Sequence, residues 1–389
     1  MSQDDLIYLD YNATTPLDPR VLAAMEPFLR GSFGNAASRH HSLGRQANEA
    51  VEESRQRIAA AIGADPREIY FTSGATESNN LALLGIAAAP AYAGRRGHII
   101  SVRTEHRAIL DPCHHLETGG HDVTLLPVDD AGRLDLEELR GAIRDDTLLV
   151  SVMHGNNEIG VLHPLQEIGK VCRERAVLFH TDATQSFGKE PIDVDRDHID
   201  ALSFSAHKMC GPKGVGGLYL RRRGPRVRCE PLIRGGGHER ELRSGTLNVP
   251  GIVGMGLAAH LGVADRETEQ PRIRELRDRL QAALLQNIED TVVNGGAAPR
   301  LAGTLNVSFP GVDAEALISR VPNLAVSTAS ACSSSTLQPS YVLGALGLSE
   351  ELLTSSLRIS LGRFTTPAEI DRAIEYILRA AQALREQSA

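Results

Sequence analysis

Short apolar runs alternate with longer amphipathic stretches along the first two-thirds of the chain. The runs are rich in Val, Ile, Leu and Phe, which is typical of strands that are buried on both faces of a sheet. They lie at 69–72, 98–102, 148–152, 177–180 and 201–204. The intervening stretches, such as 44–61 and 164–175, have helical spacing. This alternation predicts an α/β fold with a mostly parallel sheet, whose ligands bind at the carboxyl ends of the strands.

The pattern changes after residue 261. A charged amphipathic stretch near 265–288 is followed by two more strand-like runs, at 305–309 and 357–361, with helical stretches between them. Such a mixture is typical of a smaller α+β unit. We therefore predict a large domain at 17–261 and a small domain formed by 1–16 and 262–389.

The last helix is marked by its first residues. Thr366 is a preferred N-cap residue, Pro367 fits the first helical position, and Glu369 completes a capping box. We expect a helix from Pro367 toward the end of the chain.

Composition excludes several classes of protein. A formal net charge of −8 argues against a basic nucleic-acid-binding surface. The longest apolar stretch, 81–94, is too short to span a bilayer, and the first five residues lack the features of a secretory signal. The five cysteines form no Cys-x-x-Cys pair, which disfavours a disulfide framework or a zinc site. We expect a cytoplasmic protein with no nucleic-acid or membrane partner.

Chemistry that needs an amine has few candidates, because only four of the 41 basic residues are lysines. Lys208 follows the apolar run 201–204 and is flanked by Ser205 and His207. A lysine at the ligand edge of a sheet can form a Schiff base. A surface lysine is the ordinary alternative, and it fits this position poorly.

A strand also leads into a helix start at 71–80, around Gly74. Free backbone N–H groups at a helix start bind anions, and the Thr76 hydroxyl adds a donor. The alternative is an ordinary helix that Ser73 or Thr76 caps.

Two further polar residues follow strands. Asp182 ends the run that begins at 177, and a buried carboxylate needs a partner, either a protonated heterocyclic nitrogen or an arginine. His106 follows the run 98–102, where it is either structural or a ring-stacking or acid–base residue.

One cysteine lies in an unusual setting. Cys332 is surrounded by serine and alanine, which suggests an exposed loop rather than apolar burial. A thiol on a polar loop is a candidate nucleophile.

Together these clusters resemble the group I cysteine desulfurases, the NifS- and IscS-like members of the class V aminotransferase family. Seven motifs occur in that family's order, at 71–77, 104–106, 156–160, 182–185, 205–208, 243–246 and 330–332. The resemblance covers residues 6 to about 386. It implies a homodimer of fold type I that depends on pyridoxal 5'-phosphate (PLP), with the large domain binding PLP and the small domain carrying the cysteine loop.

The resemblance implies roles around the PLP ring. Lys208 would hold PLP as a Schiff base, and Asp182 would pair with the protonated pyridine nitrogen. Gln185 would hydrogen-bond the phenolic oxygen, and His106 would stack on the ring.

It also implies how the remaining groups are bound. The substrate carboxylate would be held by Asn157 and Arg358. The PLP phosphate would be held by Ala75, Thr76, Ser205, His207 and, from the other subunit, Thr246.

The implied reaction releases L-alanine from L-cysteine. Lys208 would move the Cα proton, with His106 as a further proton donor or acceptor, and the Cys332 thiolate would take the sulfur as a persulfide. The persulfide would pass to a sulfur-acceptor protein, such as an iron–sulfur scaffold or a thiolation enzyme, or serve DNA phosphorothioation. No resident metal is expected, although Cys332 could contact a transient cluster on such a scaffold.

This sequence departs from the family in three places, the first of which is Gly155 before Asn156. Ala329 stands where the family often has Gly, and the printed sequence ends at Ala389, where IscS-type enzymes continue into a scaffold-docking tail. We therefore leave docking of that kind open. The alternatives are a selenocysteine lyase or another class V PLP enzyme, such as an aminotransferase, and a sulfur-relay scaffold protein. Cys332 disfavours an aminotransferase, and the presence of Lys208, Asp182, His106 and Cys332 disfavours a scaffold.

Overall fold

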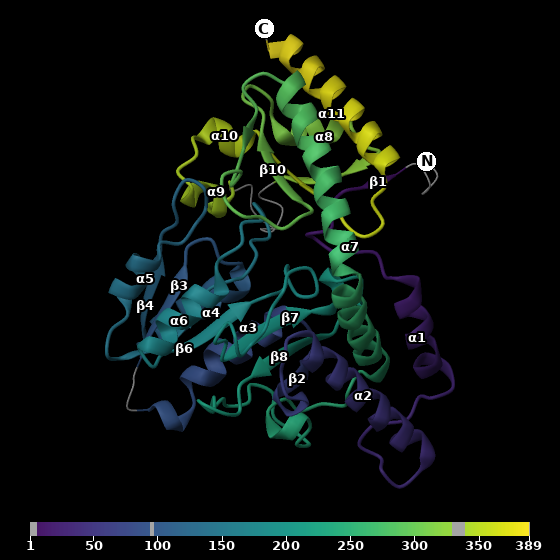
Figure 1. The fold of residues 1–389 in the computed structure, drawn as a ribbon, viewed down its shortest axis with the longest axis vertical. Coiled ribbons are helices and arrows are strands. Elements are labelled where there is room, and N and C mark those ends of the chain that lie inside the picture. The colour runs from purple at the N-terminus through teal and green to yellow at the C-terminus, as the bar shows by residue number, and fades with distance from the viewer. Residues whose placement is uncertain (1–5, 94–96, 329–338, 389) are drawn as a thin grey trace.

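The five apolar runs predicted before residue 261 pair, together with two further strands, into one seven-stranded sheet in the computed structural model, which describes residues 6–93, 97–328 and 339–388 (Figure 1). The strand order is β2-β8-β7-β6-β5-β3-β4. Six of these strands run in the same direction, and β8 alone runs in the opposite direction. The prediction of a mostly parallel α/β sheet is therefore confirmed. The strands are β2 (Ile69–Thr72), β3 (His98–Val102), β4 (Asp122–Leu126), β5 (Thr147–Ser151), β6 (Leu178–Asp182), β7 (Ala201–Ser205) and β8 (Gly216–Leu220).

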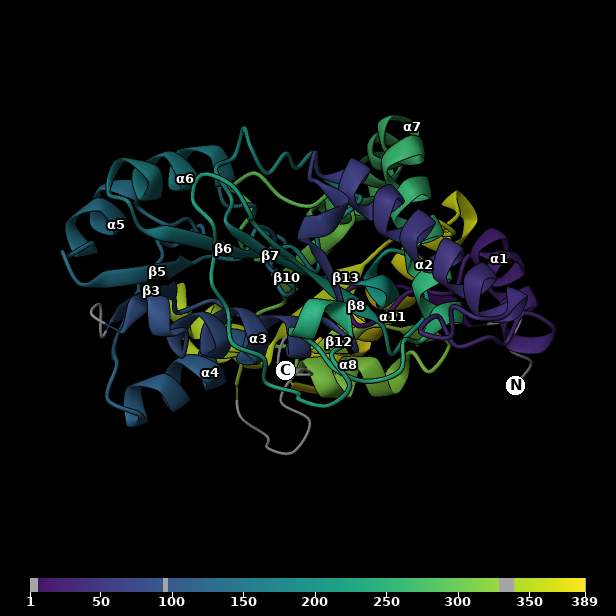
Figure 2. The same cartoon turned by 90° about the horizontal axis from the view of Figure 1, so that it is seen from below.

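Helices cover both faces of this sheet, as Figure 2 shows. On one face, apolar side chains of α3 (Ala75–Ala87) and α4 (Arg107–Thr118) pack against the strands. On the other face, α2 (Ser42–Ala61), α6 (Leu165–Glu174) and the first half of α7 (Val249–Asn287) bury a second layer of apolar side chains. The short helix α5 (Leu136–Ala142) and the N-terminal helix α1 (Pro19–Arg30) complete these layers. Burial on both faces explains why the strand sequences are almost continuously apolar.

A second, antiparallel sheet lies above the first in Figure 1. Its strands, in the order β12-β13-β10-β9, are β12 (Ser327–Thr328), β13 (Ser356–Ser360), β10 (Thr304–Ser308) and β9 (Val292–Val293). The strand β1 (Ile7–Tyr8) pairs in parallel with β11 (Leu324–Ala325) beside it. The helices of this region are α8 (Ala314–Arg320), α9 (Tyr341–Ala345), α10 (Glu350–Thr354) and α11 (Pro367–Ser388). The first strand of the chain therefore lies in a region that is built mainly from the last third of the sequence.

Helix α7 joins the two regions as one continuous helix of 39 residues. Its first half packs on the large sheet, and its second half contributes Ile273, Leu276 and Leu280 to the apolar core around β10 and β13. The predicted division between residues 261 and 262 falls inside this helix. Because the helix is continuous there, the division into a domain at 17–261 and a domain at 1–16 and 262–389 stays a prediction.

The last helix begins as its sequence indicates. The Thr366 backbone N–H donates to Glu369 Oε2 over 2.8 Å, and the Glu369 N–H donates to Thr366 Oγ1 over 3.3 Å. The predicted capping box is confirmed. In the described part of the chain, no helix has both the length and the apolar character that a bilayer crossing requires.

Candidate active site

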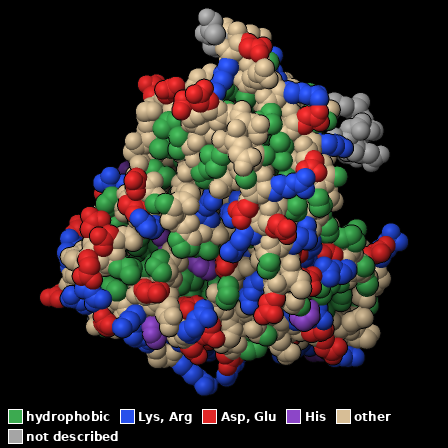
Figure 3. Space-filling model, turned by 45° about the horizontal axis from the view of Figure 1, so that its top comes forward, with side chains coloured by type: hydrophobic (Ala, Val, Ile, Leu, Met, Phe, Trp, Pro, Cys, Tyr) green, Lys and Arg blue, Asp and Glu red, His purple; other side chains and the backbone are tan. Residues whose placement is uncertain are grey.

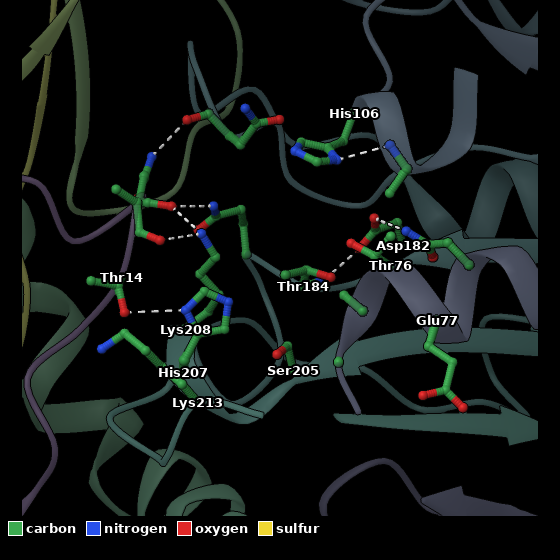
Figure 4. A pocket seen from close by; sticks show the side chains of 18 of the residues that line it. Thr14, Thr76, Glu77, His106, Asp182, Thr184, Ser205, His207, Lys208 and Lys213 are labelled. Carbon is green, nitrogen blue, oxygen red and sulfur yellow. Dashed lines mark hydrogen bonds between the residues drawn. The ribbon is translucent and has the colours of Figure 1, made fainter. Parts of the chain in front are cut away.

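A cavity of about 600 Å³ opens where the parallel strands β6 and β7 end. Most of the predicted site residues line it: Ala75, Thr76, His106, Asn157, Asp182, Gln185, Ser205, His207 and Lys208. Figure 4 shows Asp182, Lys208 and His106 facing the same space. The sheet topology thus brings together residues that are up to 133 positions apart in the sequence, Ala75 and Lys208 among them.

Lys208 ends a 3-10 turn that directly follows β7. Its Nζ donates to the carbonyl oxygens of Asn12 at 2.5 Å and Ala13 at 2.7 Å. Both acceptors belong to the N-terminal segment, which lines the cavity with Asn12, Ala13 and Thr14. These neutral acceptors hold the amine at the cavity.

Asp182 is the last residue of β6, and only 4% of its surface is exposed. Its oxygens accept hydrogen bonds from Asn79 Nδ2 at 2.7 Å and from the Thr184 N–H at 2.9 Å. Within the described ranges, no arginine forms an ion pair with it, so the arginine alternative finds no support. The carboxyl group is therefore oriented by neutral donors and faces the cavity.

Helix α3 begins at the cavity without a side-chain cap. Its N-cap residue is Gly74, and no side chain accepts a hydrogen bond there, so the alternative, an ordinary helix capped by Ser73 or Thr76, is wrong. The reason is close packing: a Cβ on Gly216 of β8 would lie 2.6 Å from the Gly74 Cα. Two glycines bring the strand against the helix start, and Ala75 and Thr76 of its first turn line the cavity, where free N–H groups can bind an anion.

Two histidines line the cavity. His106 is the N-cap residue of α4, and its Nδ1 accepts a hydrogen bond from the Ala108 N–H over 3.0 Å. His207 Nδ1 lies 3.1 Å from Thr14 Oγ1. Burial lowers the pKa of both rings, that of His207 to about 4 with a further contribution from Lys208. Both rings are thus held in the neutral form near pH 7.

Two predicted residues lie outside the lining of the cavity. Arg358, on β13, is almost fully buried and donates to the Asn157 carbonyl oxygen at 3.1 Å, so it lies behind the cavity wall. Thr246 is exposed and does not line this chain's own cavity. Cys332 and Ala329 lie outside the described residues.

The sequence analysis missed several residues of the site. Asn12 is buried, and its Nδ2 donates to the Asn157 carbonyl oxygen and to Thr304 Oγ1. Its own carbonyl oxygen accepts from Gln185 Nε2 at 2.9 Å. Thr14 and Glu77 also line the cavity. For Asn12 and Thr14, the sequence did contain a signal, namely the mainly polar residues 10–15 immediately after a short apolar stretch.

Glu77 connects the start of α3 to a distant loop. It pairs with Arg243, whose Nε lies 2.8 Å from Oε1, and it accepts from the Ser73 N–H at 2.7 Å. Arg243 lies in the 243–246 motif that ends at Thr246.

The face in Figure 3 shows acidic and basic side chains interspersed.

Two buried carboxyl groups lie directly beside site residues. Glu105 precedes His106 and is fully buried, and burial together with the charge of Asp182 raises its pKa well above the usual value. Glu158 follows Asn157, and burial raises its pKa to about 7, opposed by a hydrogen bond from Ser340. Described residues provide no cluster of ligands suited to a metal ion.

The family profile of the class-V aminotransferases matches residues 7–373. The chain therefore belongs to this family, as its motifs indicated. Relatives named cysteine desulfurase IscS, from Anaeromyxobacter dehalogenans (strain 2CP-C) and Rickettsia felis, are 53% and 52% identical to it over 382 residues. These alignments cover 98% of this chain and 94% and 92% of the two relatives.

Solved structures agree with the fold. A NifS-like protein superposes with a TM-score of 0.89 at 37% identity, covering 97% of this chain and all of that chain. DndA from Streptomyces lividans gives a TM-score of 0.78 at 41% identity, covering 90% and 98%. The structure of SspA in complex with cysteine also gives a TM-score of 0.78, at 38% identity, and covers 92% of this chain and 99% of that chain. The prediction of the PLP-enzyme fold of type I is thereby confirmed.

Proposed function

We propose that this chain is a PLP-dependent cysteine desulfurase, which converts L-cysteine to L-alanine and carries the sulfur as a persulfide on Cys332. The observation that carries the proposal is the placement of Lys208 and Asp182 at the ends of adjacent strands, facing one cavity. The relatives named cysteine desulfurase, about half identical over nearly the whole chain, support the same reaction.

The residues of the cavity fit PLP. Asp182 offers a buried carboxyl group to a pyridine nitrogen, and its partners among the described residues are neutral donors. Thr184 Oγ1 and Gln185 Oε1 are buried without a hydrogen-bond partner in the described part of the chain, so the cavity still offers polar groups to a ligand. The uncapped start of α3, with Ala75 and Thr76, suits a phosphate, as do the side chains of Ser205 and His207.

When bound, PLP supplies an electron sink next to the substrate Cα. Lys208 would hold the cofactor and, once its amine is released, take the proton from Cα and return it to the product. Asn157 and Arg358 would hold the substrate carboxylate. Gln185 and His106 would contact the cofactor ring, from its edge and its face.

Cys332 would then take the sulfur. An S–S bond forms between its thiolate and the substrate sulfur while the C–S bond of the substrate breaks, and the bonding electron pair of that bond stays with the carbon. That carbon becomes the methyl group of alanine after protonation. Cysteine plus an enzyme thiol thus gives alanine plus an enzyme persulfide, with atoms and electrons balanced and no external oxidant.

The test uses the purified protein with PLP and L-cysteine. We expect stoichiometric alanine, and sulfide when a thiol reductant is present. Cys332→Ala should retain the cofactor absorbance and lose sulfide release, whereas Cys229→Ala, which alters a partly buried cysteine outside the cavity, should keep it. Sulfide release by Cys332→Ala at the wild-type rate would contradict the persulfide step, and transamination or selenocysteine-only activity would favour the alternative enzymes.

We also propose a homodimer in which Thr246 of each subunit reaches the phosphate site of the other, and transfer of the persulfide to a sulfur-acceptor protein in the cytoplasm. The exposed position of Thr246, outside its own cavity, supports the first part. Light scattering of the holoenzyme tests the dimer. Loss of PLP affinity in Thr246→Val, with the dimer intact, tests the contact.

A further inference from the structure

The Ala108 N–H fixes which nitrogen of the His106 ring carries a proton. A backbone amide can donate a hydrogen bond but cannot accept one, so Nδ1, 3.0 Å from the Ala108 nitrogen, must present its lone pair. The proton of the neutral ring then resides on Nε2. Figure 4 shows this second nitrogen of His106 on the side of the ring away from the dashed hydrogen bond.

This constraint distinguishes His106 from the other histidine of the cavity. His207 Nδ1 faces the Thr14 hydroxyl, which can donate or accept, so either tautomer of His207 is possible. His106 has no such freedom, because its bond to Ala108 also caps helix α4. A proton could enter the ring only at Nδ1, and it would break the cap.

Three hydrogen bonds hold the turn that carries the ring. The carbonyl oxygen of Thr104 accepts from Asn156 Nδ2 at 2.9 Å. The carboxyl group of Glu105 accepts from the Met153 N–H at 2.5 Å, and the Glu105 carbonyl oxygen accepts from Tyr341 Oη at 2.7 Å. The turn is therefore fixed on both sides, and the ring cannot easily leave its cap.

We propose that His106 acts as a neutral hydrogen-bond donor through Nε2 and takes no proton during the reaction. This inference rests on the proposed function and narrows it: proton transfer at the substrate is left to the Lys208 amine, while His106 stabilises an acceptor atom in the cavity. The charged groups that act electrostatically on the ring are Asp182, Lys208, Asp111 and Arg107. Burial is the largest influence on the ring and disfavours its protonation as well.

The direct test is nitrogen NMR of the holoenzyme labelled with ¹⁵N-histidine, with His106 assigned as the signal lost in His106→Gln. We expect a protonated Nε2 and an unprotonated Nδ1 at neutral pH. His41 is an internal reference, because its Nδ1 accepts from the Gly44 N–H at 3.1 Å in the same way. A proton on Nδ1 of His106, alone or together with Nε2, would overturn the proposal.

Kinetics of two variants give a second readout. Gln places an N–H near the position of Nε2 but cannot exchange a proton, so alanine formation by His106→Gln should fall by less than about tenfold, whereas a lost general base costs about 100-fold or more. Asn can still cap the helix, but it is too short to place an N–H at the position of Nε2. The rate of alanine formation by His106→Asn should therefore fall about 100-fold. Equal losses in both variants would refute the donor role. A wild-type enzyme that forms no alanine would contradict the proposed function instead, and the NMR result would still decide the tautomer.

Discussion

The guanidinium of Arg358 donates from Nη2 to Asp10 Oδ1 over 3.0 Å, which joins the middle strand of the small sheet to the N-terminal segment. The side chain of Arg358 is 1% exposed and that of Asp10 is 16% exposed. The second carboxyl oxygen of Asp10 accepts from Ser327 Oγ at 2.9 Å. The group that we propose for the substrate carboxylate is thus oriented by a carboxylate of the protein itself.

Asp10→Asn should destabilise the enzyme and raise the KM for L-cysteine. Removing one partner of a buried ion pair leaves a buried charge uncompensated, which typically costs about 3 kcal/mol or more. Urea unfolding of the holoenzyme measures the change in free energy. Asp371→Asn is the matched control, because Asp371 pairs with Arg279 at an exposed position, where an ion pair contributes about 0–1 kcal/mol. Equal effects of the two substitutions would show that Asp10 does not compensate Arg358.

Gly216→Ala should weaken PLP binding. The added methyl would lie 2.6 Å from the Gly74 Cα and 2.8 Å from the Phe204 carbonyl oxygen, so strand β8 would have to move away from the start of α3. Overpacking of this kind costs about 1–3 kcal/mol. Gly141→Ala, on helix α5, has nothing within 4 Å of the new Cβ and should be neutral or slightly stabilising. Thermal unfolding and PLP titration by absorbance measure both effects, and an unchanged PLP affinity in Gly216→Ala would count against the phosphate site at α3.

Sequence patterns predicted the strands whose side chains are buried on both faces. The runs at 69–72 and 98–102 form β2 and β3 without a shift. Strand β4 was not predicted because it lies at the sheet edge and only its last residue is fully buried, and β8 was not predicted because it opens with two glycines. Both strands depend on tertiary context that a local pattern does not carry.

The candidate site was predictable where chemistry follows a strand, as for Asp182 and Lys208. Asn12 was not, because its hydrogen bonds join it to residues 145 to 348 positions away. The start of α3 was predicted as an anion site with a capped helix as the alternative, and the sequence could not decide between them, since the contact between Gly74 and Gly216 joins distant segments. Long-range backbone packing, rather than residue type, decides such details.

Glu239→Gln should destabilise the large sheet. Glu239 and Arg55 form a two-pronged ion pair, with both N–O distances 2.8 Å, and their side chains are 2% and 4% exposed. Glu239 also accepts from the N–H of Phe71, a residue of strand β2, which leads to the cavity, at 2.7 Å. Loss of one buried partner is expected to cost about 3–5 kcal/mol. Glu53→Gln, which alters the exposed pair with Arg57, should change stability by less than about 1 kcal/mol, and calorimetry distinguishes the two.

The pH dependence of stability should change when Glu158 is replaced by Gln. Burial raises the pKa of Glu158 to about 7 in the folded protein, from 4.5, so the folded state keeps a proton that the unfolded state releases between these values. The stability of the wild type relative to Glu158→Gln should therefore fall as the pH rises from about 4.5 to about 7, by at most about 1.4 kcal/mol per pH unit, and stay level above that range. Comparing the two proteins at each pH removes the opposite contribution of buried histidines such as His163, whose pKa burial lowers to about 4. Glu351→Gln, on the surface helix α10, provides the control, and its difference from the wild type should not vary in this way. A difference between wild type and Glu158→Gln that is constant from pH 4.5 to 8 would show that the Glu158 carboxyl group is ionised throughout in the folded enzyme.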